Sequence, residues 1–259
     1  MPTALVSYQN INRDLDATLK RTSQQPLVSR ESEYYLANIG KIDSVDEFLA
    51  DERIYRYAMK AAGLEDMTYA KAFVRKVLDE GIDDTKSFAN SLSDKRYKDF
   101  AERFNFKRYG ATTTTFTRAT QGTVDSYVRQ VLEEGAGQGN EGVRLALYFQ
   151  RKASGIEDAF QLLADPALMK VTETLFNLNL STGDIDRNAA RIEQRLDLTD
   201  LKDPEKLAKL LTRFTAMWEI AQPSSTPASS ITLLFSQPTE AGVSQNLLSS
   251  IQNLKLNGN

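Results

Sequence analysis

Apolar residues recur at intervals of three and four along most of this chain, which is the spacing of one face of an α-helix. Near the N-terminus the pattern runs from Tyr8 to Leu19 with charged residues on the other faces, and it predicts one amphipathic helix that ends before Pro26. A second run predicts a helix that ends at Gly40, the residue type expected after a helix C-terminus. Together the two runs predict a helical hairpin.

Four later runs with the same spacing predict further helices, at about 53–64, 69–80, 124–132 and 143–150. The threonine-rich segment 111–117 fits either a short extended piece or a solvated loop, and it does not predict a sheet. Alternate glycines from Gly135 to Gly139 predict a break that acts as a hinge between the last two of these helices.

One motif occurs more than once along the chain. Segments 45–51 and 159–165 share the tripeptide Leu-Ala-Asp in register, and each precedes a helical run. Segment 88–94 is a weaker copy, and 202–205 resembles the start of a fourth. The pattern predicts an all-α, multi-helix bundle built from two related helical units, about 42–108 and 156–221, followed by a C-terminal tail.

The aspartates of this motif stand where helices are predicted to begin. An N-cap carboxylate accepts hydrogen bonds from free amides of the first turn, and the proline after Asp165 or Asp203 costs no hydrogen bond at that position. We therefore interpret four aspartates as N-caps and not as catalytic groups: Asp51, Asp94, Asp165 and Asp203. Leu49 and Leu163, two residues before the caps of the two best copies, are expected to be buried.

The end of the chain differs from the rest in composition. Residues 1–222 form the predicted helical body, 223–230 is rich in proline and serine and is predicted to be a linker, and 231–259 forms the tail. The tail residues predicted to bind a protein partner form one apolar helical face: Val243, Leu247, Leu248, Ile251 and Leu254. The alternative, that this face docks on the chain's own body, stays open.

Composition limits the chemistry that the chain can carry. None of its 259 residues is cysteine or histidine, which excludes thiolate nucleophiles, imidazole bases and zinc sites built on either. Its 32 basic and 35 acidic residues give a net charge of -3, which makes a nucleic acid partner a poor expectation. No stretch approaches the roughly 20 apolar residues of a membrane span, and the N-terminal sequence does not resemble a signal peptide. We expect a cytoplasmic protein.

Two segments resemble ligand-binding loops but depart from them at decisive positions. Residues 135–142 alternate glycine like a phosphate-binding loop, with no buried strand before them and no Gly-Lys-Ser or Gly-Lys-Thr after. Residues 184–188 have the ligand spacing of a calcium loop, but Ala189 replaces the required glycine and Arg195 the bidentate glutamate. Asp184 is therefore predicted to cap a helix, and we expect neither a metal nor a cofactor.

Two further groups of residues are interpreted as structural. The acidic pairs Asp83–Asp84 and Glu133–Glu134 are predicted at solvated helix ends, where adjacent carboxylates seldom converge on one reacting atom. Aromatic residues are interleaved with basic ones around segment 96–108, a composition that suits single-stranded nucleic acid, but their helical spacing favours core packing.

Several longer strings resemble a known family. The chain resembles an alphaproteobacterial family of unknown function, DUF1217, from about Ser7 through Trp218 and again in the tail. The strings that carry the resemblance are 34–39, 46–51, 57–61, 63–67, 70–78, 142–149 and 247–256. The resemblance implies an all-helical fold and an association with flagellar gene clusters, and it implies no catalytic residue.

These observations lead to two hypotheses. The first is a non-enzymatic structural or interaction protein, associated with the flagellum, that acts by docking helices to a protein partner or to a second copy of itself. Its location would then be the cytoplasm or, after export, the flagellum. The alternative is a carboxylate-dependent hydrolase with Asp51 and Asp165 facing a groove between the two repeat halves, within about 10 Å of each other.

Overall fold

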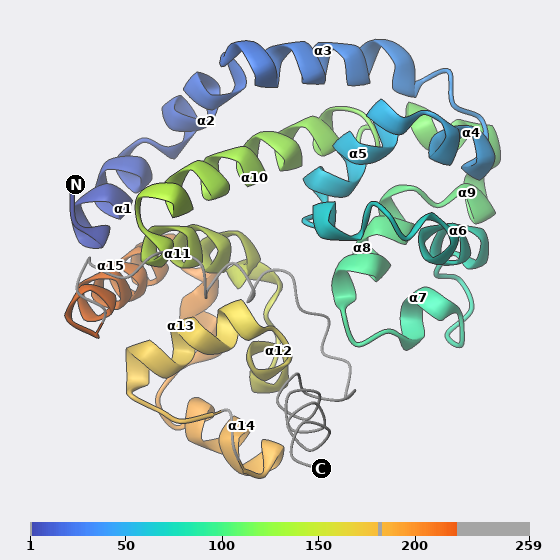
Figure 1. Cartoon of the computed structure of the whole chain (residues 1–259). Helices are drawn as coiled ribbons and strands as arrows, with labels where there is room; N and C mark the ends of the chain where they lie inside the picture. Colours follow the sequence, from blue (N-terminus) through green and yellow to red (C-terminus); the bar gives the residue numbers. More distant parts are fainter. Residues whose placement is uncertain (1, 181–182, 222–259) are drawn as a thin grey trace, which may run out of the picture.

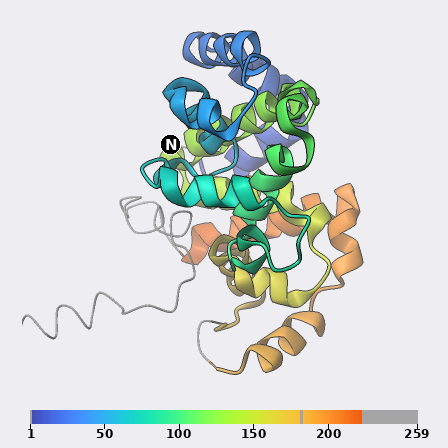
Figure 2. The ribbon, with the colours of Figure 1, turned by 90° about the vertical axis from the view of Figure 1, so that its right-hand side faces the viewer.

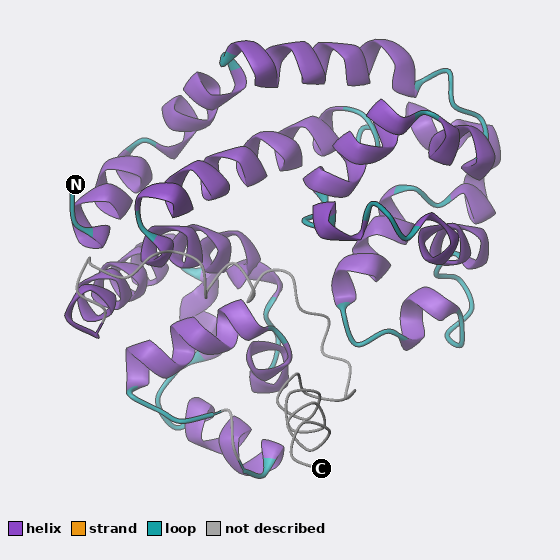
Figure 3. Cartoon of the chain, in the orientation of Figure 1, coloured by secondary structure: helices purple, strands orange, loops and turns teal. Residues whose placement is uncertain are grey.

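The fold is all-α, as predicted. A computed structural model of the chain describes residues 2–180 and 183–221, and within these ranges every regular element is a helix (Figure 3). The predicted linker and tail, including the apolar face from Val243 to Leu254, lie outside the described residues.

The helices fall into two sequential groups. The first group contains α1 (Ala4–Arg13), α2 (Leu15–Ser23), α3 (Pro26–Ile39), α4 (Val45–Ala50), α5 (Glu52–Ala61), η1 (Glu65–Met67), α6 (Lys71–Glu80), α7 (Phe88–Ser91), α8 (Lys95–Arg103), α9 (Phe106–Tyr109) and η2 (Gly110–Thr115). The second contains α10 (Gln121–Gly139), α11 (Glu141–Lys152), η3 (Ala153–Gly155), α12 (Ala159–Ala164), α13 (Pro166–Phe176), α14 (Ile185–Glu193), η4 (Leu198–Lys202) and α15 (Pro204–Ala221).

Buried side chains form two hydrophobic cores. The first core takes residues from Val28 to Val128, and the second joins Ala4 and Tyr8 of α1 to residues from Val143 to Trp218. α10 packs on α5 and α2 on one side and on α11 on the other, so this long helix connects the two cores (Figure 1). Seen from the side, the blue helices near the N-terminus lie above the yellow and orange helices α12–α14 (Figure 2).

The N-terminal region differs from the prediction. The expected single helix is two, because Asp14 leaves the helical conformation and caps α2 by accepting a hydrogen bond from the amide of Ala17. α1, α2 and α3 then follow one another in an arc and do not fold back as a hairpin (Figure 1). α1 packs on α15 and α11 while α3 packs on α5, so the arc contacts both groups of helices.

The threonine segment is helical, contrary to both expectations. It forms the 3₁₀ helix η2, in which Thr113 and Thr114 are fully buried. Their hydroxyls donate to the carbonyls of Asn105 and Ile42, at 3.1 and 3.0 Å. These side-chain bonds fix the tight backbone and explain why a β-branched run is stable in a helical turn here.

The glycine segment does not break the chain, so the predicted hinge position is wrong. α10 runs through Gly135 and Gly137 to Gly139, and Asn140 then caps α11. A Cβ at position 137 would lie 2.8 Å from the Cδ atom of Arg144. A larger residue at position 137 would force the Arg144 side chain to shift, because α10 and α11 meet closely at their corner.

Candidate functional site

A cavity of about 800 Å³ lies between the two groups of helices. One wall is α8 with the residues before it, and the other is formed by one face of α11 and the corner where α12 meets α13. Its volume is within the range typical of ligand pockets, and we call it the inter-unit cavity.

Asp165 forms the corner of this cavity at the start of α13. One carboxylate oxygen accepts from the amides of Ala167 and Leu168, at 2.9 and 3.1 Å, which confirms the predicted N-cap. The other accepts from the Tyr148 hydroxyl at 2.6 Å. Burial and the adjacent Asp165 carboxylate raise the pKa of Tyr148 well above its usual value, so this phenol stays a hydrogen-bond donor.

The opposite wall has a corner of the same type at the start of α8. Asp94 caps the helix through the amide of Arg96, at 3.0 Å, again as predicted. Its two oxygens also accept from the Arg96 guanidinium, whose Nη1 reaches the Gly63 carbonyl. The guanidinium is thereby fixed between α8 and the turn that follows α5.

The walls of the cavity carry charges of both signs in equal number. The lining includes five cationic residues, Lys95, Arg96, Lys98, Arg144 and Lys152, and five anionic ones, Asp94, Asp99, Glu102, Asp158 and Asp165. One ion pair spans the gap, from Lys152 of α11 to Asp99 of α8 at 3.5 Å. The lining also contains Phe160, whose side chain is 46% exposed although it is a large apolar residue.

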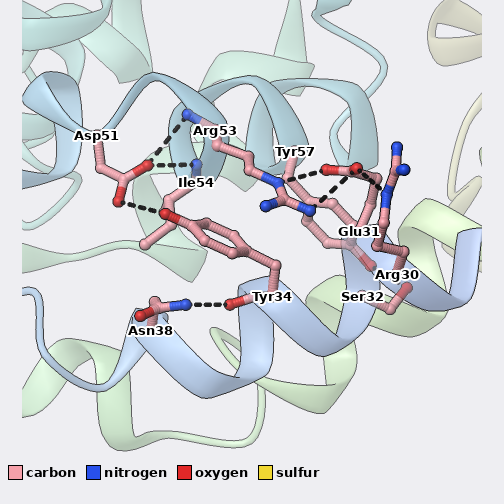
Figure 4. A network of polar contacts seen from close by, with 9 residues as sticks. All are labelled: Arg30, Glu31, Ser32, Tyr34, Asn38, Asp51, Arg53, Ile54 and Tyr57. Atoms are coloured by element: carbon pink, nitrogen blue, oxygen red, sulfur yellow. Dashed lines mark hydrogen bonds and ion pairs between the residues drawn. The ribbon is translucent and has the colours of Figure 1, made fainter. Parts of the chain in front are cut away.

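Asp51 occupies a corresponding corner in the first group of helices (Figure 4). Its carboxylate accepts from the amides of Arg53 and Ile54, at 3.1 and 3.0 Å, and from the Tyr34 hydroxyl at 3.4 Å. The Arg53 guanidinium lies 3.7 Å above the Tyr34 ring and forms two hydrogen bonds with Glu31. Asp51 is therefore an N-cap, and it is not among the residues that line the inter-unit cavity.

The two copies of the motif also match in their capping boxes. Ser44 and Asp158 cap the short helices α4 and α12. The side-chain oxygens of Glu47 and Gln161 accept hydrogen bonds from the backbone amides of Asp43 and Glu157, at 2.8 and 2.9 Å. The local match does not extend over the whole predicted units, because the range 42–108 continues with α7 and α8, whereas 156–221 ends in the single long helix α15.

The remaining aspartate caps are confirmed as well. Asp184 accepts from the amide of Asp186, and Asp203 from the amides of Glu205 and Lys206, between 2.9 and 3.2 Å. Among the described residues no cluster of three or more acidic side chains is arranged to hold a metal ion.

Burial of the motif leucines is only partly as expected. Leu49 is buried, but Leu163 is half-buried at the edge of the second core, where Leu162 takes the fully buried place. The aligned positions thus share their backbone geometry but not their packing.

The acidic pair on α10 is placed differently from the prediction. Glu133 and Glu134 lie within the helix and not at its end, and the side chain of Glu133 is only 1% exposed. Glu133 pairs with Arg129 at 3.0 Å and with Arg151 of α11 at 2.8 Å. Sequence spacing shows the Arg129 partner one turn away, whereas the Arg151 partner comes from tertiary packing.

The other acidic pair and the aromatic residues have the structural roles predicted for them. Asp83 follows the end of α6, where Gly81 adopts a positive φ of 64°, and pairs with Arg108. Three aromatic side chains of segment 96–108 are buried in the first core: Phe100, Phe104 and Phe106.

Comparison with known proteins assigns the family. The model of the family described as "Protein of unknown function (DUF1217)" matches residues 61–207, more than half of the chain. The chain belongs to the DUF1217 family. The fold is also similar to the crystal structure of an Agrobacterium tumefaciens protein, with a TM-score of 0.79 and 51% identity over 84% of this chain and 94% of that one. No curated protein gives a significant match.

The DUF1217 match contains the whole lining of the inter-unit cavity, which runs in sequence from Ser93 to Leu168. Asp51 and the tail lie outside the matched range. None of the described helices combines the length and the apolar character that a membrane crossing demands.

Proposed function

We propose that this DUF1217 protein is a non-enzymatic interaction protein that holds a segment of a protein partner in the inter-unit cavity. Its association with the flagellum is part of the proposal and rests on the resemblance of its sequence to a family linked to flagellar gene clusters. The chemistry of the cavity walls supports a binding role over the hydrolase alternative.

The observation that supports this proposal is that most carboxylates of the cavity already accept hydrogen bonds or ion pairs within the fold. Four of the five are already acceptors within the fold: Asp94, Asp99, Asp158 and Asp165. Hydrolysis by two carboxylates needs one group free to donate a proton and another to activate water or attack. Carboxylates held by backbone amides and by a tyrosine hydroxyl stabilise helix starts instead.

The same walls indicate the chemistry of the partner. Cationic and anionic side chains are interspersed, so a segment that carries both signs of charge would find partners along both walls. Phe160 would supply an apolar anchor that is exposed in the free protein. We therefore propose a polypeptide segment with mixed charge and at least one large apolar side chain.

Quantitative co-purification tests this function. Tagged protein is isolated from its native cells as the wild type, as Phe160→Glu and as Ala37→Glu, the last a matched control at an exposed position of α3 outside the cavity lining. We expect one partner to be retained by the wild type and the control and reduced at least tenfold by Phe160→Glu. Equal recovery by all three proteins would contradict the proposed role of the cavity.

A further inference from the structure

The outer face of α3 is a surface of a different kind from the inter-unit cavity. One side of α3 packs on α2, α5 and α10, and its other side lies at the edge of the molecule (Figure 1). Two leucines on this outer side, Leu27 and Leu36, are 59% and 42% exposed. Apolar side chains so placed stabilise a molecule only when another surface covers them. The exposed residues of α3, which we call the α3 face, are Pro26, Leu27, Arg30, Glu33, Leu36 and Ala37.

The spacing of the α3 face is that of a helix that packs on another helix. Positions 26, 30, 33 and 37 follow one another at intervals of four, three and four residues, like the contact positions of a coiled coil. Leu27 and Leu36 are nine residues apart, about two and a half turns, so they lie on opposite flanks of this strip.

The α3 face is complementary to itself when two copies of the helix run antiparallel. A two-fold axis that passes between positions 31 and 32 brings Arg30 of each chain beside Glu33 of the other. The same axis brings Pro26 and Leu27 of each chain to the level of residues 36 and 37 of the other, which are also apolar. The contact would therefore have two ion pairs at its centre and an apolar layer at each end.

Both central charges can form these pairs without losing the contacts they already have. Arg30 has a side chain that is 69% exposed, and its Nε lies 3.3 Å from Glu31. Glu31 is itself bound by Arg53 through two hydrogen bonds of 2.7 and 3.1 Å (Figure 4). Glu33 accepts from the Ser29 hydroxyl at 2.7 Å. A guanidinium has five donors and a carboxylate about four acceptor sites, which leaves capacity for one more ion pair on each side chain.

We propose that the α3 face is the contact of a reversible homodimer, in which the α3 helices of two copies of this chain pack antiparallel about a two-fold axis. One helix of 14 residues against its copy is a smaller contact than the stable interfaces of about 1,200 to 2,000 Å². The dimer is therefore weak, and its population depends on protein concentration. None of the residues of α3 lines the inter-unit cavity, so each copy keeps its own cavity accessible.

Sedimentation equilibrium of the full-length chain, over about a hundredfold range of concentration, tests the proposal. The wild type should change from monomer to dimer across this range. Arg30→Glu or Glu33→Arg places like charges together at both central positions, and each should raise the dissociation constant of the dimer at least tenfold. An equimolar mixture of the two variants should dimerise again, because one chain then carries two carboxylates and the other two guanidinium groups at the facing positions.

Two controls have their changes outside the α3 face. Lys209→Glu, a charge reversal at an exposed position of α15, and Phe160→Glu should both keep the dissociation constant of the wild type. All variants are compared at equal helical content by circular dichroism. A wild type that stays monomeric, charge reversals at position 30 or 33 that leave it unchanged, or a mixture that associates no more than its components would overturn the proposal.

Ala37→Glu separates this dimer from the function proposed for the inter-unit cavity. It lies on the α3 face and should weaken the dimer, but it should not reduce the recovery of the partner. Phe160→Glu should have the opposite pair of effects, so either proposal can fail while the other stands.

Discussion

The carboxylates of Asp51 and Asp165 each have two roles at a corner between helices, as an N-cap and as the acceptor of a tyrosine hydroxyl. One oxygen binds two amides of the helix that begins there, and the other accepts a tyrosine hydroxyl from the helix that lies alongside. The cap could be read from the sequence because it depends on neighbours within three residues. The bonds to Tyr34 and Tyr148 could not, because they join residues 17 positions apart through the tertiary fold.

Removing these caps gives the first prediction. Asp51→Ala and Asp165→Ala should each lower the free energy of unfolding by about 1 to 2 kcal/mol, since each leaves two first-turn amides and a tyrosine hydroxyl without their acceptor. Urea denaturation measures the loss. Asp79→Ala, at an exposed position of α6, is the control and should change stability by less than about 0.5 kcal/mol.

Replacing two glycines of the α10–α11 region by alanine should change the free energy of unfolding in opposite directions. A Cβ at Gly142 would lie 2.3 Å from Cδ1 of the buried Trp218, so Gly142→Ala should destabilise the protein by about 1 to 3 kcal/mol and change the tryptophan fluorescence. Gly135 has open space around it within the C-terminal part of α10, and Gly135→Ala should increase the free energy of unfolding by about 0.5 to 1 kcal/mol. Thermal melts measure both changes: the melting temperature should fall for Gly142→Ala and rise for Gly135→Ala.

The buried carboxyl of Glu141 should make the stability of the protein depend on pH. Its side chain is buried at the start of α11, and its Oε1 has no hydrogen-bond partner among the described residues. Burial, opposed by Arg144, raises the pKa of this carboxyl from 4.5 to about 7. The folded state therefore holds the proton more tightly than the unfolded state, so the contribution of this group to stability should be full below pH 4.5 and lost as the pH rises through about 7.

Glu141→Gln isolates this contribution because it keeps the shape of the side chain and removes its titration. Denaturation at several pH values should give a smaller decline in stability between pH 4.5 and about 7 for the variant than for the wild type. Identical profiles for both proteins would exclude Glu141 as the origin of the dependence.

At the scale of elements, periodicity predicted helix identity well and helix ends less well. The runs over 53–64, 69–80 and 143–150 correspond to α5, α6 and α11, because one face of each helix is buried in a core. The break at Asp14 was missed because the apolar spacing continues across it while the aspartate starts a new cap. Segment 135–139 is helical although its alternate glycines predict a break, because Gly137 lies in close contact with α11 and none of these glycines forms a turn.

Packing of the two motif copies leads to a prediction at this scale. Leu49 is buried in the first core and Leu163 is only half-buried, so Leu49→Ala should cost about 2 to 5 kcal/mol and Leu163→Ala about 1 kcal/mol. Leu162→Ala, at the buried neighbouring position, should match the larger cost. Equal losses at positions 49 and 163 would mean that the burial of the two motifs is alike after all.

At the scale of the whole molecule, the inter-unit cavity results from the arrangement of two cores. Its walls come from α8 on one side and from α11–α13 on the other, which are separated by about 40 residues of sequence. The hydrolase alternative places both Asp51 and Asp165 in a groove between two repeat halves, but only Asp165 lines this cavity. The sequence could not exclude Asp51 or identify Asp94, Arg96 and Phe160 as lining residues, because the path of α10 decides which helices face each other.

Site-specific photo-cross-linking shows whether the inter-unit cavity holds a segment of a protein partner. A benzophenone amino acid replaces Phe160 in the cavity or Tyr69, which is 79% exposed and outside the cavity lining, and the cells are irradiated. We expect a discrete adduct with one cellular protein from position 160 that position 69 does not give. The same adduct from both positions, or none from position 160 in protein that folds with normal helical content, would mean that the inter-unit cavity does not hold a partner segment.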